Sequence, residues 1–411
     1  MIRILLPTNR ILATTSACGV NPFRMTSGSA VSSTTQYEEA VRLLNTLQSN
    51  AATIKKLRGQ RDHLQTMNLP QCRKYLESMR ITQKELDALN IIHVSGTKGK
   101  GSTCAYAEAI LRARGFKTGL YTSPHLIHVR ERIRINGEPV DEQIFAEEFF
   151  HVYDMIKTDH SENMPAYFKF LTLLAFRIFV KEKVEVVILE VGIGGEYDCT
   201  NVIEHPKVCG VTTLDYDHIS LLGSKLSEIA WHKAGIFKDN VPAVYSPTTV
   251  EAENVLLSRA SSKNVQISEA PPISDYCFAR SISPGISGLH QFPNISLALQ
   301  LIRHWSEQCQ LPILELPSDT PSYRGFPVPE WMCDAIESCR WPGRSQVVRT
   351  NRNVTYLLDG AHTPKSMEAC AEWAAEEFAN LGKKSVKKIA LFQCTADRSP
   401  STLINYLKDK F

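Results

Sequence analysis

A short glycine-rich segment carries the residue types that bind phosphate. It reads Gly-Thr-Lys-Gly-Lys-Gly-Ser from Gly96 to Ser102, between a β-branched stretch and a helical pattern. Glycines let backbone N–H groups approach phosphate oxygens, and a helix N-terminus adds partial positive charge. The Lys100 ammonium can neutralise the β- and γ-phosphates of a nucleotide. Two residues rather than four separate Gly96 from Gly99, which departs from the usual phosphate loop. The context still favours a nucleotide site over a plain turn.

Acidic and histidine residues follow two apolar runs that have the composition of buried strands. Glu190 comes at the end of the run that starts at Val184, and Asp217 and His218 come shortly after the run 208–214. Ligands bind at the carboxyl ends of strands in parallel sheets, and carboxylate oxygens suit Mg²⁺. Glu190 is therefore a candidate magnesium ligand, with a salt-bridged structural glutamate as the alternative. His218 binds or orients a metal, or is structural.

Three later polar residues are weaker candidates. Asp359 follows an expected strand at 354–358, and Arg344 follows a Trp-Pro-Gly turn. Lys233 shares its segment with Lys238, and by physical chemistry alone this lysine pair is better explained as a solvated helix face.

The elements around these residues alternate between strand and helix. Runs rich in β-branched residues predict strands at 91–94, 117–121, 184–191 and 208–214. Apolar residues at helical spacing predict helices at 36–47, 69–89, 104–114, 167–180 and 294–305. Residues 246–287, rich in Ser, Pro and Asn, predict loops or short strands, and 129–134 alternates like an exposed strand. The order indicates an α/β fold, a mostly parallel sheet that carries the phosphate loop and is flanked by helices.

A smaller α/β, Rossmann-like domain is expected to follow, over 339–411. It shows strands at 354–358 and 388–392, with helices at 364–378 and 401–411. Two βα units leave apolar faces open, so we expect this domain to be incomplete and residues after about 345 to be loosely held. The larger, central domain that carries the predicted nucleotide site is expected over 37–338.

Bulk composition excludes several classes of protein. A chain of 411 residues suggests two domains, and a net charge of +3 is too small to argue for nucleic acid binding. No apolar stretch is long enough for a membrane span. The 11 cysteines form no CxxC pair, which argues against a zinc knuckle.

The first 36 residues have the composition of a mitochondrial transit peptide. No Asp or Glu occurs from Met1 to Tyr37, while three arginines are spread among Ser, Thr and apolar residues. The alternative is a disordered tail without acids. A chain started at Met25 would lose most of this segment, so we expect both mitochondrial and cytoplasmic forms.

Taken together, these segments resemble the Mur-ligase superfamily, and closely the folylpolyglutamate synthases of eukaryotes. The matching stretches are HVSGTKGKGST (93–103), TSPHLIHVRERIRING (122–137), LEVGIGGEYDCTN (189–201), LDYDHISLLG (214–223), WHKAGIFK (231–238), GLHQFPN (288–294), WPGR (341–344) and YLLDGAHT (356–363). They occur in the family's order over roughly residues 90 to 363. The short phosphate loop is the family's own form.

The resemblance implies a role for each matching residue. The ATP site would contain Gly99, Lys100, Gly101, Ser102, Asn294, Arg344 and Asp359. Ser123, Glu190 and His218 would bind Mg²⁺. Lys233 matches a lysine that is often carbamylated in this superfamily, and Lys100, Lys233 and His218 would take part in catalysis.

The activity implied is an ATP- and magnesium-dependent ligase of folate metabolism. ATP would activate the γ-carboxylate of a tetrahydrofolate (poly)glutamate as an acyl phosphate, which the amine of L-glutamate attacks, giving ADP and phosphate. The protein is expected to be a monomer. The alternatives are a dihydrofolate synthase or dual enzyme, and a truncated, non-catalytic form that binds nucleotide or folate.

Overall fold

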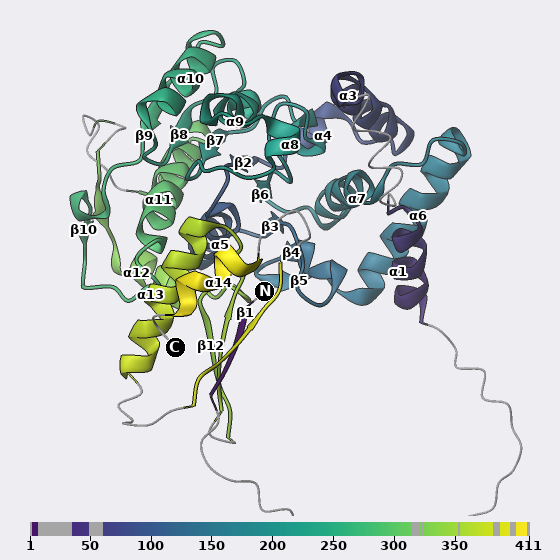
Figure 1. Ribbon diagram of the computed structural model, residues 1–411. Helices are drawn as coiled ribbons and strands as arrows, with labels where there is room; N and C mark the ends of the chain where they lie inside the picture. The colour runs from purple at the N-terminus through teal and green to yellow at the C-terminus, as the bar shows by residue number, and fades with distance from the viewer. Residues whose placement is uncertain are drawn as a thin grey trace, which may run out of the picture. The chain divides into compact units, whose positions relative to one another are not determined.

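The computed structural model describes residues 2–6, 35–48, 61–314, 321, 324–351, 354–380, 387–394 and 400–408. The chain forms two compact units, a larger one of Ala40–Arg344 and a smaller one of Met1–Glu39 with Ser345–Phe411. Figure 1 labels their elements. None of the helices in the described ranges is both long enough and apolar enough to cross a bilayer.

An eight-stranded sheet forms the centre of the larger unit. Its order is β5-β4-β3-β6-β2-β7-β8-β9. The strands are β2 (Ile92–Ser95), β3 (Thr118–Tyr121), β4 (Ile133–Ile135), β5 (Glu138–Pro139), β6 (Val186–Glu190), β7 (Val208–Val211), β8 (Ala243–Tyr245) and β9 (Ile267–Glu269). Neighbours from β3 to β9 pair in parallel, while β4 and β5 are antiparallel. The expected mostly parallel α/β sheet is confirmed.

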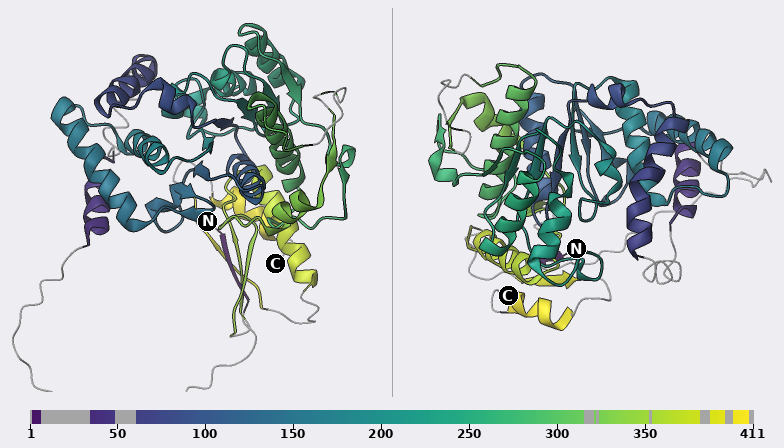
Figure 2. Two further views of the ribbon diagram at one scale, coloured as in Figure 1. Left: turned by 180° about the vertical axis from the view of Figure 1, so that it is seen from behind. Right: turned by 90° about the horizontal axis from the view of Figure 1, so that it is seen from above.

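Helices cover both faces of this sheet, as the right-hand view of Figure 2 shows. One face carries α5 (Lys100–Ala113), α11 (Gln291–Gln308) and α12 (Glu330–Ser338), and the other carries α3 (Arg61–Ser78), α6 (Glu142–His160) and α7 (Tyr167–Glu182). Successive side chains of β3 point to opposite faces of the sheet, and their neighbours identify a helix on each face. Leu120 belongs to the apolar cluster that contains α5, and a Cβ on Gly119 would meet Phe179 of α7. Every residue of β6 is buried, which is why it reads as an unbroken apolar run.

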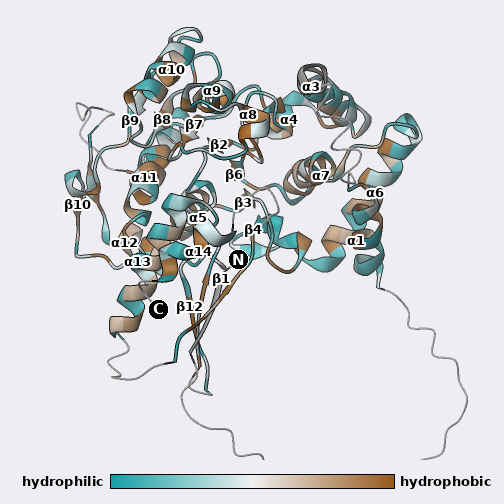
Figure 3. Ribbon diagram, in the orientation of Figure 1, coloured by the Kyte–Doolittle hydropathy of each residue, from teal (hydrophilic) through white to brown (hydrophobic). Residues whose placement is uncertain are grey.

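The larger unit contains further helices and strands. They are α1 (Gln36–Thr46), which begins in the last residues of the smaller unit's N-terminal segment, α4 (Gln83–Asp87), α8 (Ile219–Leu222), α9 (Leu226–Lys233), α10 (Val250–Ser261), β10 (Cys277–Phe278) and β11 (Pro327–Val328). In the described part of this unit, 3₁₀ turns occur at Val129–Arg132, Cys199–Val202, Ala234–Ile236 and Ile273–Asp275. Figure 3 shows how apolar residues are distributed over the elements, with α7 among the most hydrophobic helices.

Three local predictions are wrong in detail. The single helix expected at 69–89 is two helices, because Thr82 and Glu85 form a capping box that starts α4 after a break at the left-handed Arg80. The strand expected at 129–134 begins as a 3₁₀ turn and becomes β4 only at Ile133.

The largest local error lies in 246–287, where loops or short strands were expected: the short strands β9 and β10 are present, but a helix was not expected. This segment contains the 12-residue helix α10. Its N-cap Thr249 accepts a hydrogen bond from the Ala252 N–H, and its buried residues Ala252, Leu256 and Ala260 recur every four positions. The buried face is small, so its periodicity is weak in the sequence.

The smaller unit contains more strands than expected. Its sheet has the order β12-β13-β1-β14, formed by Gln346–Arg349, Thr355–Asp359, Ile2–Leu6 and Ile389–Phe392. Strand β1 pairs antiparallel with both β13 and β14, so the two strands predicted from sequence are not neighbours. Residues 2–6 of the predicted transit segment form that strand, and residue 1 and residues 7–34 lie outside the described residues.

Two helices accompany the small sheet, α13 (Pro364–Asn380) and α14 (Pro400–Lys408). Buried residues of β13, α13 and α14 form one apolar cluster that includes Leu357, Trp373 and Leu407. The expectation that residues after about 345 are loosely held stays a prediction.

Candidate nucleotide and metal site

The polar motifs of the larger unit converge at one edge of its sheet. The strands β3, β6, β2 and β7 are consecutive neighbours and run in parallel. Ser123 follows β3, Glu190 is the last residue of β6, the glycine-rich loop follows β2, and His218 follows β7. Because the carboxyl ends of parallel strands meet at one edge, side chains from distant parts of the sequence share one site.

The glycine-rich loop is shaped by close contacts that only glycine permits. Gly96 has φ +142°, and a Cβ there would lie 1.8 Å from the Thr212 Oγ1 atom. Gly99 has φ +87°, and a Cβ there would lie 2.1 Å from the Asn294 Oδ1 atom. Helix α5 starts directly afterwards at Lys100, so the N–H groups of its first turn, which have no partner within the helix, point towards the loop. This is the geometry of an anion site at a helix N-terminus.

The neighbours of this loop include two predicted site residues. Ser102 is buried in the first turn of α5, and a Cβ on Gly101 would lie 3.2 Å from the Trp341 Nε1 atom. Asn294 is buried, and its Nδ2 group donates to the Gln291 Oε1 atom at 2.9 Å. Asn294 therefore holds its amide against the loop and limits which residue can occupy position 99.

Two lysines share one carbonyl at the base of the loop. Lys100 Nζ donates to the Gly96 carbonyl at 3.2 Å, and Lys233 Nζ donates to the same oxygen at 2.5 Å. Burial lowers the pKa of Lys233 well below its usual range, and the charge of Lys100 lowers it further. The solvated-face interpretation of Lys233 is therefore wrong, because its side chain is 3% exposed.

Glu190 lies beside both Lys100 and Ser123. Its Oε2 atom accepts the Ser123 N–H at 2.8 Å, and its Oε1 atom is 4.0 Å from Lys100 Nζ. Burial raises the pKa of the Glu190 carboxyl, while Lys100, the Ser123 N–H and Arg344 act in the opposite direction. A buried carboxylate that faces a cation and a backbone N–H at a strand end fits both a magnesium ligand and a structural salt bridge, so the metal role of Glu190 stays a prediction.

The donor types at this edge fit Mg²⁺. Within the described ranges, no group of three or more His, Cys, Asp and Glu side chains is arranged to hold a metal. Mg²⁺ uses one or two protein carboxylates and completes its shell with water and phosphate oxygens, so a single buried carboxylate, Glu190, beside Ser123 is compatible with a magnesium site. His218 is exposed at the start of α8, on the loop that follows the neighbouring strand.

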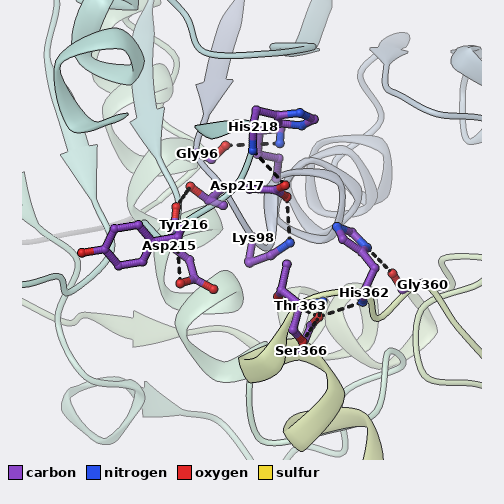
Figure 4. Close-up of polar contacts among 12 residues, drawn as sticks. Gly96, Lys98, Asp215, Tyr216, Asp217, His218, Gly360, His362, Thr363 and Ser366 are labelled. Carbon is purple, nitrogen blue, oxygen red and sulfur yellow. Dashed lines mark hydrogen bonds and ion pairs between the residues drawn. The ribbon is translucent and has the colours of Figure 1, made fainter. Parts of the chain in front are cut away.

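The remaining predicted residues lie at the end of the larger unit and in the smaller one. Arg344 ends the larger unit, and its charge reaches Glu190. Asp359 lies in the smaller unit, where its Oδ2 atom accepts the Ser345 N–H at 2.7 Å and its Oδ1 atom accepts the Ala361 N–H at 2.8 Å. The same turn continues with His362, whose N–H donates to the Ser366 Oγ atom at 3.0 Å (Figure 4).

The site contains one ion pair whose two residues were not among the site residues predicted from the sequence. Lys98 Nζ donates to the Asp217 Oδ2 atom at 3.0 Å (Figure 4). The sequence pattern assigns no separate role to Lys98, which is one residue of the glycine-rich loop, or to Asp217, which precedes His218. The signal for the pair was a cation inside a glycine-rich loop and an acid after the adjacent strand.

Comparisons with known proteins agree with this architecture. A putative folylpolyglutamate synthase of Caenorhabditis elegans is 71% identical over 410 residues, which cover 99% of this chain and 80% of that protein. The mitochondrial folylpolyglutamate synthase of Cricetulus griseus is 42% identical over 391 residues, which cover 91% of this chain and 66% of that protein. No protein-family model matches the chain.

Two solved structures show a similar fold. A complex of folylpolyglutamate synthase with AMPPCP and folate superposes with a TM-score of 0.68 at 24% identity, covering 84% of this chain and 81% of that one. The Thermotoga maritima folylpolyglutamate synthase gives 0.65 at 21% identity, covering 91% and 88%. Fold, site and sequence identity together define a nucleotide-binding α/β protein of the ligase type. The chain belongs to the folylpolyglutamate synthase family.

Proposed function

We propose that this protein is an ATP- and magnesium-dependent ligase that adds L-glutamate to the γ-carboxylate of tetrahydrofolate (poly)glutamates. The observation that carries the proposal is the convergence of Lys100, Glu190 and the glycine-rich loop at one sheet edge, in a chain that is 71% identical to a putative folylpolyglutamate synthase. A related structure with AMPPCP and folate supports the same substrates.

The residues act on the charge that moves during the reaction. The N–H groups at the start of α5 and the Lys100 ammonium hold the phosphates of ATP and offset charge on the transferring phosphoryl group. Glu190, Ser123 and His218 hold Mg²⁺, which neutralises phosphate oxygens when bound. The product of this step is an acyl phosphate on the γ-carboxylate. The amine of glutamate attacks its carbonyl carbon, and phosphate leaves.

Lys233 is proposed to carry a carbamate. Burial lowers its pKa, which favours the neutral amine, the form whose lone pair can attack CO₂. A nitrogen–carbon bond forms, one carbon–oxygen π bond opens to a carboxylate oxygen, and a proton leaves the nitrogen. With ¹³C-bicarbonate, the wild-type protein is expected to show a carbamate signal by NMR that Lys233→Ala lacks. Identical spectra would assign Lys233 a purely structural role.

The proposal also covers the localisation and the oligomeric state of the protein. Residues 1–36 direct the protein to mitochondria, a chain started at Met25 stays in the cytoplasm, and the enzyme acts as a monomer. Relatives whose names include "mitochondrial" support the first statement.

The decisive experiment is incorporation of labelled glutamate. The purified chain is incubated with ATP, Mg²⁺ and labelled glutamate, with tetrahydrofolate in one reaction and dihydropteroate in the other. The expected result is ATP-dependent labelling of tetrahydrofolate with release of phosphate. Labelling of dihydropteroate alone identifies a dihydrofolate synthase, and labelling of both identifies a dual enzyme. ATP binding without phosphate release in either reaction overturns the ligase proposal in favour of a non-catalytic form.

A further inference from the structure

The loop after β7 is tied to the glycine-rich loop through the backbone. The N–H groups of Thr97 and Lys98 both donate to the Thr213 carbonyl at 3.1 Å, and the Thr97 hydroxyl donates to the Asp215 carbonyl at 3.1 Å. These bonds do not involve the Lys98 side chain. A substitution at Lys98 therefore leaves the two loops joined, and its effect reports on the side chain itself.

The Lys98 side chain adds a charged contact to this backbone frame. Its ammonium lies 3.0 Å from Asp217 Oδ2, and the two side chains are 22% and 12% exposed. Two residues 119 positions apart in sequence thus form an ion pair that is largely shielded from solvent. Shielded pairs are screened by salt much less than surface pairs, so this pair can keep the Lys98 and Asp217 side chains in a fixed relative position.

Asp217 passes this constraint to the next residue. Its second oxygen, Oδ1, accepts the His218 N–H at 3.0 Å. His218 has φ +50°, a left-handed conformation that a residue with a Cβ rarely adopts without support. The His218 carbonyl then accepts the N–H groups of Leu221 and Leu222 as α8 begins. Both sides of the His218 backbone are therefore held in place.

The charges around Lys98 explain why it needs this partner. Lys100 lies close enough to repel it, and Asp217 forms an ion pair with it at 3.0 Å. Burial lowers the pKa of Lys98, and Asp217 opposes that shift by favouring the charged form. Replacing Asp217 would remove the interaction that most favours the charged form of Lys98, and replacing Lys98 would remove the cation at 3.0 Å from Asp217.

We propose that Lys98 is a positioning residue that fixes His218 for metal binding through Asp217, an inference that rests on the magnesium site of the proposed function. The chain of contacts runs from the Lys98 ammonium to one Asp217 oxygen, and from the other oxygen to the His218 backbone. The competing role is a direct contact between Lys98 and a nucleotide phosphate. The positioning role requires Asp217 and affects nucleotide binding only when Mg²⁺ is present. A direct contact with phosphate requires neither Asp217 nor Mg²⁺.

A double-mutant cycle on nucleotide binding separates these roles. The full chain is prepared as wild type, Lys98→Ala, Asp217→Asn and the double variant, and Mg²⁺ is titrated at fixed AMPPCP by calorimetry. Asp217→Asn keeps an oxygen for the His218 N–H and removes only the ion pair. Each single variant is expected to raise the Mg²⁺ midpoint about fivefold to tenfold, and the double variant no further. Lys84→Ala, which removes an exposed charge on α4, is the control and should match wild type.

Three further outcomes make the test decisive. Lys98→Arg keeps the charge and should restore the midpoint to within about twofold of wild type, which rules out misfolding as the cause. AMPPCP binding without Mg²⁺ should be the same for wild type and Lys98→Ala. Multiplying effects in the double variant, or Mg²⁺-free binding that weakens with Lys98→Ala, would overturn the proposal and assign Lys98 to phosphate. Because binding is measured, a chain without ligase activity would refute the proposed function and leave this test intact.

Discussion

Replacing Lys100 by alanine tests the assignment of the glycine-rich loop most directly. The side chain is 16% exposed, and its ammonium lies 3.2 Å from the Gly96 carbonyl and 4.0 Å from Glu190 Oε1. The truncation should leave the fold intact, because the Gly96 carbonyl still accepts a hydrogen bond from Lys233 Nζ. The variant therefore removes a positive charge from the site without opening the loop.

The size of the effect follows from the distances. Two unit charges 4.0 Å apart interact by about 4 kcal/mol at an effective dielectric constant of 20. Removing a preorganised donor from developing negative charge costs roughly 2.7–4 kcal/mol, which is about a hundredfold to a thousandfold in kcat. We therefore expect Lys100→Ala to lower kcat by at least about a hundredfold at saturating ATP.

The assay is ATP-dependent incorporation of labelled glutamate into tetrahydrofolate, with the melting temperature measured on the same samples. Lys84→Ala removes an exposed lysine charge on α4 and should retain full turnover. A loss in kcat with an unchanged melting temperature supports a catalytic role. Near-normal turnover in Lys100→Ala, or a loss that parallels a fall in melting temperature, would refute the reasoning.

Three other predictions follow from the same structure. Glu190→Gln should raise the Mg²⁺ concentration needed for activity, because an amide is a poorer ligand for a hard dication; overlapping Mg²⁺ titrations would show that Glu190 is structural. Gly99→Ala should abolish nucleotide binding, since its Cβ would lie 2.1 Å from Asn294 Oδ1. Gly115→Ala is the matched control, because Gly115 has a similar positive φ with nothing within 4 Å; equal nucleotide affinity in the two variants would contradict the argument. Residues 1–36 fused to a fluorescent reporter should direct it to mitochondria, and a diffuse signal would count against targeting.

Parts of the fold could be predicted because their signals are local. Strand β2, the glycine-rich loop and α5 are contiguous, so β-branched residues, glycines and helical spacing identify them in order. Strand β6 is buried on both faces, so its composition alone marks it as central. The polar residues that end or follow these strands could likewise be selected as site candidates, because the carboxyl edge of a parallel sheet is where ligands bind.

Other features depend on pairings between distant segments. Strand β1 lies between β13 and β14 in the small sheet, and no local pattern in Ile2–Leu6 specifies those neighbours. Helix α10 buries a narrow face of only three residues, two of them alanines, so its periodicity is too weak to recognise without the surface that it packs on. Lys233 looks like a solvated lysine in sequence and is buried only because α9 packs beneath the loop.

The amino-acid sequence by itself determined the family, the parallel sheet and the identity of the loop that is proposed to bind phosphate, because those depend on residue types in short contiguous segments. Only the tertiary structure decided which charges face each other. The strand order β6-β2-β7 places Glu190, Lys98 and Asp217 at one edge, and that order is set by packing across the whole sheet. The Lys98–Asp217 pair joins residues 119 positions apart, and the sequence marks each of the two residues but not their contact.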